Sequence, residues 1–235
     1  MRKITIVIPT YNEAMNIAGI CAAVLAVAPE VHILIVDDNS PDGTGAIALE
    51  LAKNDSHISV LERKGKEGLG KAYLNAFEII LADPEVEIIC TMDADFSHNP
   101  SDIPALIAAC TNHDVAIGSR YIRGGTTEGW SFWRKMLSRG GNLYARFVIG
   151  IPVWDITAGF SAVQTQALRK IDLGTIDSSG YAYQIELKYA LWKSGAHIVE
   201  IPIIFRERIG GESKISGHII SEGIMAPWKM IWRRK

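Results

Sequence analysis

The first half of the chain alternates short apolar runs with longer segments of helical periodicity. Runs rich in valine, isoleucine and leucine occupy residues 4–9, 32–36, 58–61, 86–92 and 115–117. Segments whose apolar positions recur at helical spacing lie between them, at residues 12–28, 44–53, 69–81 and 101–109. Nearly continuous apolar strands separated by helices are typical of a parallel sheet covered on both faces. The pattern therefore predicts an α/β fold with a mostly parallel central sheet.

In the second half of the chain, this alternation gives way to loops and aromatic helices. The predicted elements are an aromatic and basic helix at residues 130–148, a loop at 154–160, a helix at 181–194, a strand at 197–205 and a polar loop at 206–216. No linker, repeat or low-complexity segment separates the two halves. We therefore expect one domain over residues 1–235.

Composition and charge narrow the class of protein. The chain of 235 residues is 48% apolar and 21% charged, which is typical of a globular protein. Its net charge of −2 argues against a general nucleic-acid binder, so we expect no nucleic-acid partner. Three widely spaced cysteines in apolar surroundings favour a reducing compartment. The sequence has no uninterrupted apolar run of about 18 residues, and Pro9 ends the first run too early for a signal peptide. We therefore expect a cytoplasmic location.

The loops after the strands are the candidate site, because ligands of such sheets bind beyond the carboxyl ends of the strands. The first loop is PTYNE (residues 9–13), and the second, VDDNSPDGT (residues 36–44), holds three carboxylates. Each loop also has a purely structural interpretation. The first is an ordinary strand-to-helix turn, and the second is a solvated turn with Asp42 near a helix start.

The loop after the fourth strand holds candidate metal ligands. Asp93 and Asp95 follow the apolar run at alternate positions, which share one face of a strand. Two carboxylates suit Mg²⁺ or Mn²⁺ bridging to a diphosphate, because Mg²⁺ commonly takes one or two carboxylates plus phosphate oxygens. An Asp-x-Asp pair alone is common, but its place after a strand favours a metal site.

Two other classes of nucleotide-binding protein are disfavoured, because the chain lacks their complete phosphate-binding motifs. Residues 65–72 (GKEGLGKA) nearly fit the phosphate-binding loop G-x-x-x-x-G-K-[ST]. However, Ala72 lacks the hydroxyl that binds Mg²⁺, and Glu67 would face the phosphates. A dinucleotide-binding oxidoreductase would carry G-x-G-x-x-G after the first strand, where PTYNE stands.

Basic side chains in the second half are candidates for phosphate binding. Arg120 follows a strand, Arg134 lies near Ser138 on the aromatic helix, and Arg208 and Lys214 lie in the polar loop. Guanidinium groups suit phosphate geometry, although any one of these residues alone is more typical of a surface ion pair. Their shared place in loops and near helix ends favours a common anionic ligand.

Two segments are candidates for contact with a membrane surface. Residues 130–148 place Trp133, Met136 and Phe147 at helical spacing with cations among them, which fits either a core-packing helix or an interfacial one. Residues 228–235 combine two tryptophans with basic side chains, which suits anionic lipid headgroups or an ordinary solvated chain end.

Taken together, the loop motifs resemble those of the inverting family 2 glycosyltransferases, and more narrowly those of the dolichol-phosphate (polyprenol-phosphate) mannosyltransferases. The motifs that carry the resemblance are PTYNE (9–13), VDDNSPDGT (36–44), GLG (68–70), DADFSHNP (93–100), GSRY (118–121), DITAGF (155–160) and RIGGESK (208–214). The resemblance covers nearly the whole chain. It implies a GT-A nucleotide-diphospho-sugar transferase fold, with a nucleotide-sugar and metal-binding half at residues 1–120 and an acceptor-binding half at 121–235.

The resemblance also implies a function and a set of site residues. It implies an inverting, Mg²⁺- or Mn²⁺-dependent transfer of mannose from GDP-mannose to a polyprenyl (dolichyl-type) phosphate at the cytoplasmic face of a membrane. By resemblance, the nucleoside ligands are Pro9, Tyr11, Glu13 and Asp38, and the metal and diphosphate ligands are Asp93 and Asp95. The residues expected to gather the two phosphates are Arg120, Arg134, Ser138, Arg208 and Lys214. Catalytic roles are expected for Asp95, Arg120, Arg208 and Lys214.

The chain departs from the family pattern at several points. Ser97 stands where members often carry Gln, and Ala158 where Ser is common. Many relatives continue into transmembrane helices, whereas this chain stops at Lys235, so we expect peripheral attachment to the membrane. Two alternatives remain. One is a family 2 glycosyltransferase that uses a UDP-sugar such as UDP-glucose, or a non-lipid acceptor, and the other is a non-catalytic nucleotide-sugar-binding protein.

Overall fold

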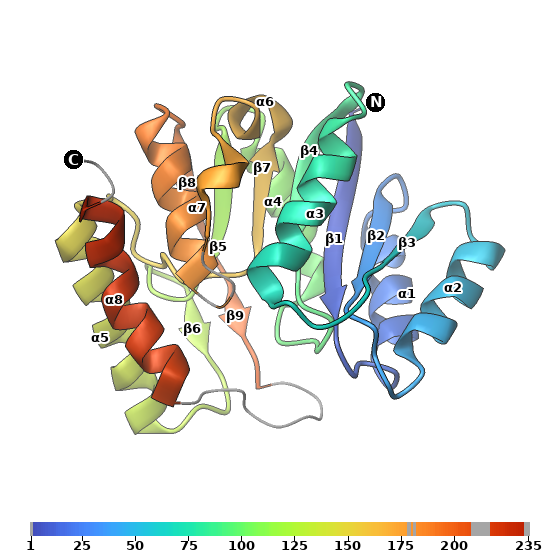
Figure 1. The fold of residues 1–235 in the computed structure, drawn as a ribbon, viewed down its shortest axis with the longest axis horizontal. Coiled ribbons are helices and arrows are strands. Elements are labelled where there is room, and N and C mark those ends of the chain that lie inside the picture. The colour runs from blue at the N-terminus through green and yellow to red at the C-terminus, as the bar shows by residue number, and fades with distance from the viewer. Residues whose placement is uncertain (1, 178–179, 181, 208–216, 233–235) are drawn as a thin grey trace.

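The computed structural model of the chain describes residues 2–177, 180, 182–207 and 217–232. Its centre is a seven-stranded sheet of order β3-β2-β1-β4-β7-β5-β8 (Figure 1). The strands are β1 (Lys3–Thr10), β2 (His32–Asp37), β3 (Ile58–Glu62), β4 (Val86–Thr91), β5 (Val115–Ser119), β7 (Ser161–Gln164) and β8 (Ile198–Pro202). Only the pairings of β7 with β4 and β5 are antiparallel. The predicted α/β fold with a mostly parallel sheet is confirmed.

Strand β7 was not predicted, because nothing in its four residues marks a strand. Its Ser-Ala-Val-Gln sequence is too short and too polar to form an apolar run. Pairing on both edges forms the strand instead: Val163 lies opposite Ile89 of β4, and Ala162 lies opposite Ala116 of β5. Its formation therefore depends on contacts distant in sequence.

The strand predicted at residues 197–205 is divided between two sheets. Beyond β8, Ile203 donates its backbone N–H to Ser119 of the central sheet (3.0 Å) and accepts from Thr126 (3.0 Å). The chain then continues as β9 (Ile204–Phe205), which pairs in parallel with β6 (Thr126–Thr127). Pro202 at the end of β8 has no N–H to donate, which favours the change of partner here.

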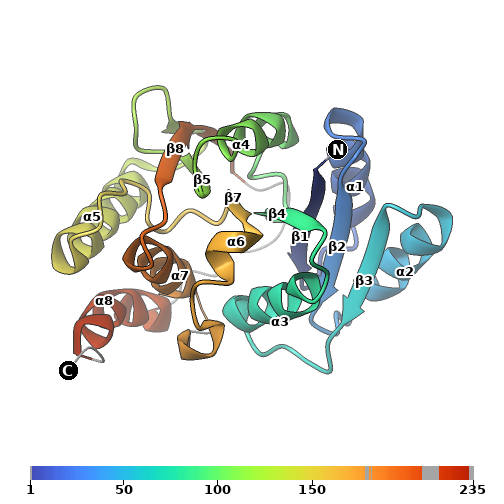
Figure 2. The ribbon, with the colours of Figure 1, turned by 90° about the horizontal axis from the view of Figure 1, so that it is seen from above.

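Helices cover both faces of the sheet (Figure 2). They are α1 (Ile17–Val27), α2 (Thr44–Asn54), α3 (Leu69–Leu81), α4 (Ile103–Ala109), α5 (Phe132–Ile149), α6 (Thr165–Leu168), α7 (Ala182–Lys193) and α8 (Gly217–Trp232), with 3₁₀ turns at Pro100–Asp102 and Leu173–Thr175. Helices α1, α2 and α4 pack on one core, which includes Ile6, while α3 and α7 pack on another, which includes Val7. Successive residues of β1 thus serve opposite faces. Among the described residues, no helix has the length and apolar content needed to cross a membrane.

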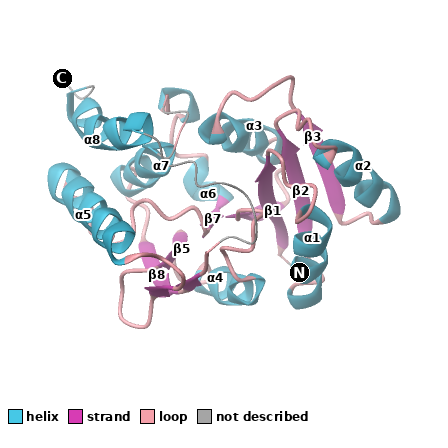
Figure 3. Ribbon diagram, turned by 90° about the horizontal axis from the view of Figure 1, so that it is seen from below, coloured by secondary structure: helices cyan, strands magenta, loops and turns pink. Residues whose placement is uncertain are grey.

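The helix boundaries follow local chemistry. Helix α1 begins five residues later than the predicted start at residue 12, because Asn12 has a φ of 62° and residues 13–16 form a turn. Ser131 caps α5, where its hydroxyl accepts the Arg134 N–H (3.3 Å), and Gly150 ends the helix in the left-handed region at φ 71°. Figure 3 shows the side on which the parallel strands end, with α5 and α8 at one margin and α1 and α2 at the other.

Candidate active site

A cavity of about 230 Å³ lies at the carboxyl edge of the central strands, and we call it the site cavity. Its wall comes from the loops after β4 and β5, the loop before β7, and helices α5 and α7. Five residues singled out from the sequence line it: Asp93, Asp95, Arg120, Arg134 and Ser138. Arg208 and Lys214 lie outside the described residues. The structure therefore brings the predicted metal ligands and three predicted phosphate ligands to one hollow.

Asp93 and Asp95 lie just beyond β4, which ends at Thr91, in a tight turn. The Asp93 side chain is 36% exposed, whereas Asp95 is 7% exposed and accepts the Ser97 N–H at Oδ1 (3.0 Å). Phe96, which lies between Asp95 and Ser97, has a φ of 58°, a left-handed conformation that is rare for an aromatic residue. The turn thus holds both carboxylates on the cavity wall.

The donor set of this turn fits a divalent metal that shares its coordination with a ligand. Among the described residues, no group of three or more His, Cys, Asp or Glu side chains could hold a metal ion alone. A Mg²⁺ site with one or two carboxylates typically takes its other ligands from phosphate oxygens and water. A Cβ added at Gly159 would lie in van der Waals contact with Asp93 Oδ1, at 3.8 Å, so a side chain here would occupy space beside that carboxylate that glycine leaves open.

His98 supports this turn as a neutral side chain. Its Nδ1 accepts the Asp93 backbone N–H (3.2 Å), so the ring proton of the neutral form lies on Nε2. The ring is stacked on Phe160, with centroids 4.9 Å apart, and meets the edge of Phe205. Burial lowers the pKa of His98 to about 4, so its 3.9 Å approach to the Asp93 carboxylate is not an ion pair at neutral pH.

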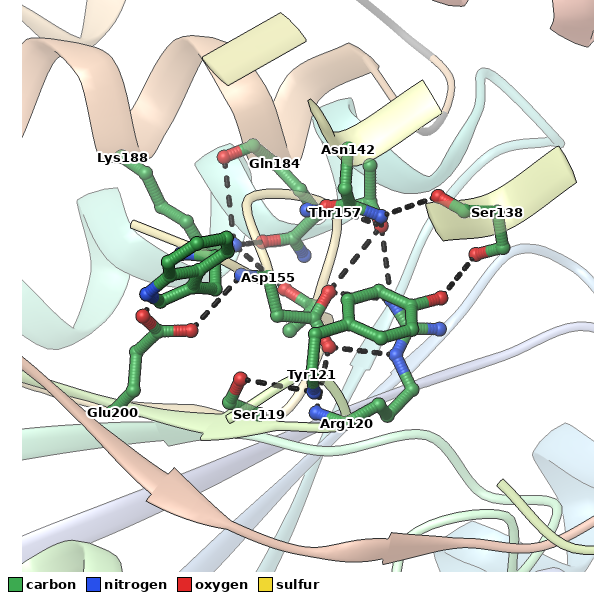
Figure 4. Close-up of polar contacts among 12 residues, drawn as sticks. Ser119, Arg120, Tyr121, Ser138, Asn142, Asp155, Thr157, Gln184, Lys188 and Glu200 are labelled. Carbon is green, nitrogen blue, oxygen red and sulfur yellow. Dashed lines mark hydrogen bonds and ion pairs between the residues drawn. The ribbon is translucent and has the colours of Figure 1, made fainter. Parts of the chain in front are cut away.

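Arg120 is held by a buried carboxylate that was not among the predicted site residues. Its Nε and Nη2 donate to the two oxygens of Asp155 (2.7 and 2.6 Å), and its backbone N–H donates to Oδ2 (2.9 Å; Figure 4). Asp155 is fully buried, and Glu200 of β8 accepts the backbone N–H groups of Trp154 and Asp155 (2.8 and 2.9 Å). The guanidinium at the cavity wall is therefore fixed by a loop residue, Asp155, and the backbone of that loop is held in turn by β8.

Helix α5 is tied to the loop before β7 through polar contacts. Thr157 donates its backbone N–H to Asn142 Oδ1 (3.1 Å), and its hydroxyl oxygen accepts from Asn142 Nδ2 (3.0 Å) and Arg120 Nη2 (2.9 Å). On the same helix, Ser138 accepts a hydrogen bond from the Tyr121 hydroxyl (2.5 Å; Figure 4). These bonds hold α5, with Ser138, against the part of the cavity wall that carries Arg120.

Arg134 forms the outer part of the same wall. Its guanidinium lies over the ring of Trp130, 4.2 Å from the centroid, and its Nη1 donates to Glu207 (3.0 Å). The Arg134 side chain keeps 23% of its surface exposed, compared with 9% for Arg120. Arg134 is therefore the more accessible of the two cations.

The wall of the site cavity carries buried polar atoms that have no hydrogen-bond partner in the described part of the chain. They are Ser97 Oγ, Trp130 Nε1, Arg134 Nε and Gln184 Nε2. Three of them are N–H groups, which can only donate. Buried donors left unpaired are costly, so this arrangement fits an occupant rich in acceptor oxygens.

The predicted nucleoside ligands lie at the ends of β1 and β2, outside the site cavity. Lys66 Nζ lies over the Tyr11 ring, 3.9 Å from its centroid. Asp38 is 6% exposed and forms an ion pair with Arg63, which was missed from the sequence. Burial raises the pKa of the Asp38 carboxyl, while the attraction of Arg63 acts in the opposite direction. This charged pair and the half-buried Tyr11 ring, at the ends of neighbouring strands, are a second candidate wall for a nucleotide.

The other acidic and polar residues of these loops build turns. Glu13 accepts from the Asn16 amide (2.9 Å), and its backbone N–H donates to Thr44 Oγ1 (2.9 Å). Asp37 accepts from the Thr10 and Ser40 hydroxyls (2.9 and 2.6 Å). Pro9 lies opposite Val36 within the sheet. Asp42 accepts from the Thr44 N–H and hydroxyl (3.0 and 2.6 Å) at the start of α2, as the structural interpretation of this loop expects, whereas Asp37 is buried and Asp38 is paired with a cation.

Comparisons with known proteins agree with this geometry. The family described as "Glycosyl transferase family 2" matches residues 5–172. The polyprenol monophosphomannose synthase of Mycolicibacterium smegmatis is 45% identical over 231 residues, which cover 97% of this chain and 87% of that protein. The undecaprenyl-phosphate mannosyltransferase of Micrococcus luteus is 43% identical over 225 residues, which cover 96% and 92%.

A solved structure supports the fold. The glucosyl-3-phosphoglycerate synthase of Mycobacterium tuberculosis, in complex with Mn²⁺, uridine diphosphate and phosphoglyceric acid, matches with a TM-score of 0.71 at 18% identity. The match covers 97% of this chain and 78% of that chain. At this identity the likeness shows the fold alone, and it confirms the expected GT-A type. Because the family pattern spans most of the chain and two relatives align over nearly all of it, the chain belongs to glycosyltransferase family 2.

Proposed function

We propose that the protein transfers mannose from GDP-mannose to a polyprenyl phosphate, with inversion and with the aid of Mg²⁺ or Mn²⁺. The observation that carries the proposal is the site cavity, whose wall combines Asp93 and Asp95 with Arg120 and Arg134. The two relatives that align over nearly the whole chain are named for phosphomannose synthesis on polyprenol and for mannose transfer to undecaprenyl phosphate. Residues 1–120 would hold the nucleoside and the metal, and residues 121–235 would bind the acceptor.

On the donor side, Asp93 and Asp95 would hold the metal. When bound, a divalent ion supplies positive charge that offsets the charge developing on the departing nucleoside diphosphate. The charged pair of Asp38 and Arg63, with the Tyr11 ring nearby, would bind the nucleoside at the ends of β1 and β2. Pro9 and Glu13 would shape the same loop.

On the acceptor side, the chain's cations would align two anions. The second ionisation of a phosphate monoester has a pKa of about 6, so the attacking oxygen is already largely anionic at pH 7. No strong general base is then required. Arg120, Arg134 and Ser138 would screen and orient the two phosphates, and Arg208 and Lys214 would add to them from outside the described residues.

We further propose that helix α5 contacts the membrane that holds the acceptor lipid. Large apolar side chains of α5 are exposed, including Trp133 (75%), Met136 (51%), Leu143 (61%) and Phe147 (87%). At 100° per residue these four fall within an arc of about 80° on the helix. These four side chains do not pack in the core, because the buried residues of α5 are Asn142, Ala145 and Ile149. Exposed aromatic side chains beside cations suit the headgroup region of a membrane.

A transfer assay tests the proposal. Purified protein is incubated with Mg²⁺ or Mn²⁺, a short-chain polyprenyl phosphate and radiolabelled GDP-mannose, and the label extracted into organic solvent is counted. We expect label in the organic phase that depends on both the metal and the lipid phosphate.

The same assay separates the alternatives. Signal from UDP-glucose but not from GDP-mannose would overturn the proposed donor and keep the site. Binding of a nucleotide sugar without transfer, across a panel of donors and acceptors, would show a non-catalytic protein.

A further inference from the structure

Gln184 is a buried amide on the wall of the site cavity that none of the proposed roles uses. It lies near the start of α7 and is 2% exposed. Its Oε1 accepts a hydrogen bond from Lys188 Nζ (3.1 Å), one helical turn further along. Its Nε2 is buried and has no hydrogen-bond partner among the described residues.

The contact with Lys188 determines the orientation of the Gln184 amide. The Lys188 amine is 2% exposed and also donates to the backbone oxygen of Ala158 (2.6 Å). A protonated amine only donates, and a neutral one keeps two N–H groups, so in either state it can donate to both oxygens. Rotating the amide would take Oε1 away from this donor and place amide N–H groups against the protonated amine, which has no lone pair to accept them. The amide nitrogen therefore stays on the side away from Lys188, as Figure 4 shows.

We propose that Gln184 Nε2 donates a hydrogen bond to a hydroxyl group of the transferred sugar. The inference rests on the proposed function in taking a nucleotide sugar as the ligand of the site cavity. A buried donor without a partner loses the hydrogen bonds it made to water, and an acceptor oxygen of the ligand would restore one.

A sugar hydroxyl fits this position better than a phosphate does. The cavity already presents guanidinium groups from Arg120 and Arg134, which match phosphate in charge and shape. Gln184, by contrast, offers a neutral donor. Its partner Lys188 donates to the backbone oxygen of Ala158, and the next residue, Gly159, lies beside the Asp93 carboxylate. In the proposed complex, Asp93 marks the diphosphate end of the donor. A hydrogen-bonding group next to this end would meet the sugar.

The test compares the binding of a nucleotide sugar with that of its nucleoside diphosphate. Gln184→Glu keeps the shape and the acceptor for Lys188 but removes the donor. In calorimetric titrations with Mg²⁺, we expect affinity for the nucleotide sugar to fall about tenfold and affinity for the nucleoside diphosphate to stay within about twofold. The melting temperature should not decrease, because the new carboxylate pairs with Lys188. Gln166→Glu, the same change on an exposed residue, is the matched control and should alter neither affinity.

A second variant separates the lost donor from the added charge. Gln184→Met is uncharged and of similar length, and it should also lower affinity for the nucleotide sugar selectively. Equal losses for the sugar nucleotide and the diphosphate, or no loss for either, would overturn the proposal. A loss confined to the KM for polyprenyl phosphate would also overturn it and assign Gln184 to the acceptor.

The comparison does not depend on which donor the protein uses. It is made with GDP-mannose and GDP, and with UDP-glucose and UDP, and the pair that the wild type binds is used for the variants. If the wild type binds UDP-glucose but not GDP-mannose, the proposed donor is contradicted. The role of Gln184 is then tested with UDP-glucose and UDP.

Discussion

Arg120 and Asp155 show, at the scale of single residues, how the site keeps charge away from water. Both are buried, at 8% and 0% exposure, and their bidentate contact is completed by Thr157 and by the Arg120 backbone N–H. Burying an ion pair is not strongly stabilising by itself, but removing one partner leaves an uncompensated charge. The pair is thus more important for holding the guanidinium in place than for net stability.

Asp155→Asn tests this arrangement. It removes the countercharge of Arg120 while keeping the size of the side chain, so we expect the free energy of unfolding to fall by about 3 kcal/mol. Chemical denaturation measures the change. Glu128→Gln is the matched control, because it breaks an ion pair with Arg206 in which both side chains are more than half exposed, and it should cost less than about 0.5 kcal/mol. Equal effects of the two substitutions would contradict the role given to burial.

Lys188 gives the stability of the protein a pH dependence of its own. Burial lowers the pKa of Lys188 from its ordinary 10.5 to about 7. Between these values the unfolded chain binds more protons than the folded one, so stability rises with pH across this window. Nearby Asp155 and Glu200 raise the pKa and Arg120 lowers it, but burial is the largest effect.

The measurement compares wild type with Lys188→Met at several pH values from 6.5 to 9.5, a window chosen around these pKa values. The free energy of unfolding of the wild type should rise relative to the variant as pH increases, by up to about 1.4 kcal/mol per pH unit. A difference between the two proteins that does not change with pH would show that Lys188 keeps an ordinary pKa.

At the scale of elements, helix α5 performs two tasks on two faces. Its inner face carries Asn142, which binds Thr157 at the site, and its outer face presents Phe147. Helix α8 lies beside α5 (Figure 1), and the Trp228 indole N–H donates to the Tyr144 hydroxyl (2.7 Å). A membrane contact made by the outer face would therefore lie one helix diameter from the cavity wall.

Phe147→Glu tests the outer face. Placing a charge where an apolar ring would enter the headgroup region should lower binding to vesicles of anionic phospholipid about tenfold, as measured by cosedimentation. The control is Ile79→Glu on α3, a helix away from this face, where the side chain is 51% exposed. If both variants lose the same amount of binding, the contact is not specific to α5. Unchanged melting temperatures would show that neither change disturbs the fold.

The elements were predictable where their signals are local. Helix α3 has the predicted bounds, Leu69–Leu81, because an apolar face recurs along it. Strands β1 to β5 follow their apolar runs within a few residues. Strands β6, β7 and β9 were not predicted as separate elements. Their two to four residues become strands only through partners far away in the chain.

The site was predictable to the extent that its residues belong to loop motifs. Asp93, Asp95 and Arg120, which belong to such motifs, lie on the wall of the site cavity. Gln184 and Lys188 lie inside a helix with no motif of their own, and their importance depends on the Ala158 carbonyl, 30 residues from Lys188. Arg63 was missed for the same reason, because only folding places it beside Asp38.

At the scale of the whole molecule, ligand and metal should stabilise the protein together. A ligand that binds only the folded state stabilises it in proportion to the logarithm of its concentration over Kd. We expect GDP-mannose with Mg²⁺ to raise the melting temperature, and EDTA to remove most of the increase. Asp95→Asn should abolish the difference between Mg²⁺ and EDTA while its own melting temperature without ligand stays near that of wild type. If GDP-mannose raises the melting temperature of the wild type equally with Mg²⁺ and with EDTA, the metal site is contradicted.

The antiparallel strand β7 has a consequence for the order in which the protein is built. It lies between β4 and β5, yet it comes from residues 161–164, after both of them in the chain. During synthesis, β1 to β4 emerge first and can pair with one another, whereas β5 has no partner in the sheet until β7 and β8 have left the ribosome. The loop before β7 carries Asp155, so the closing of the sheet and the fixing of Arg120 become a single late event. A nascent chain that has not reached β7 would therefore lack a completed catalytic centre.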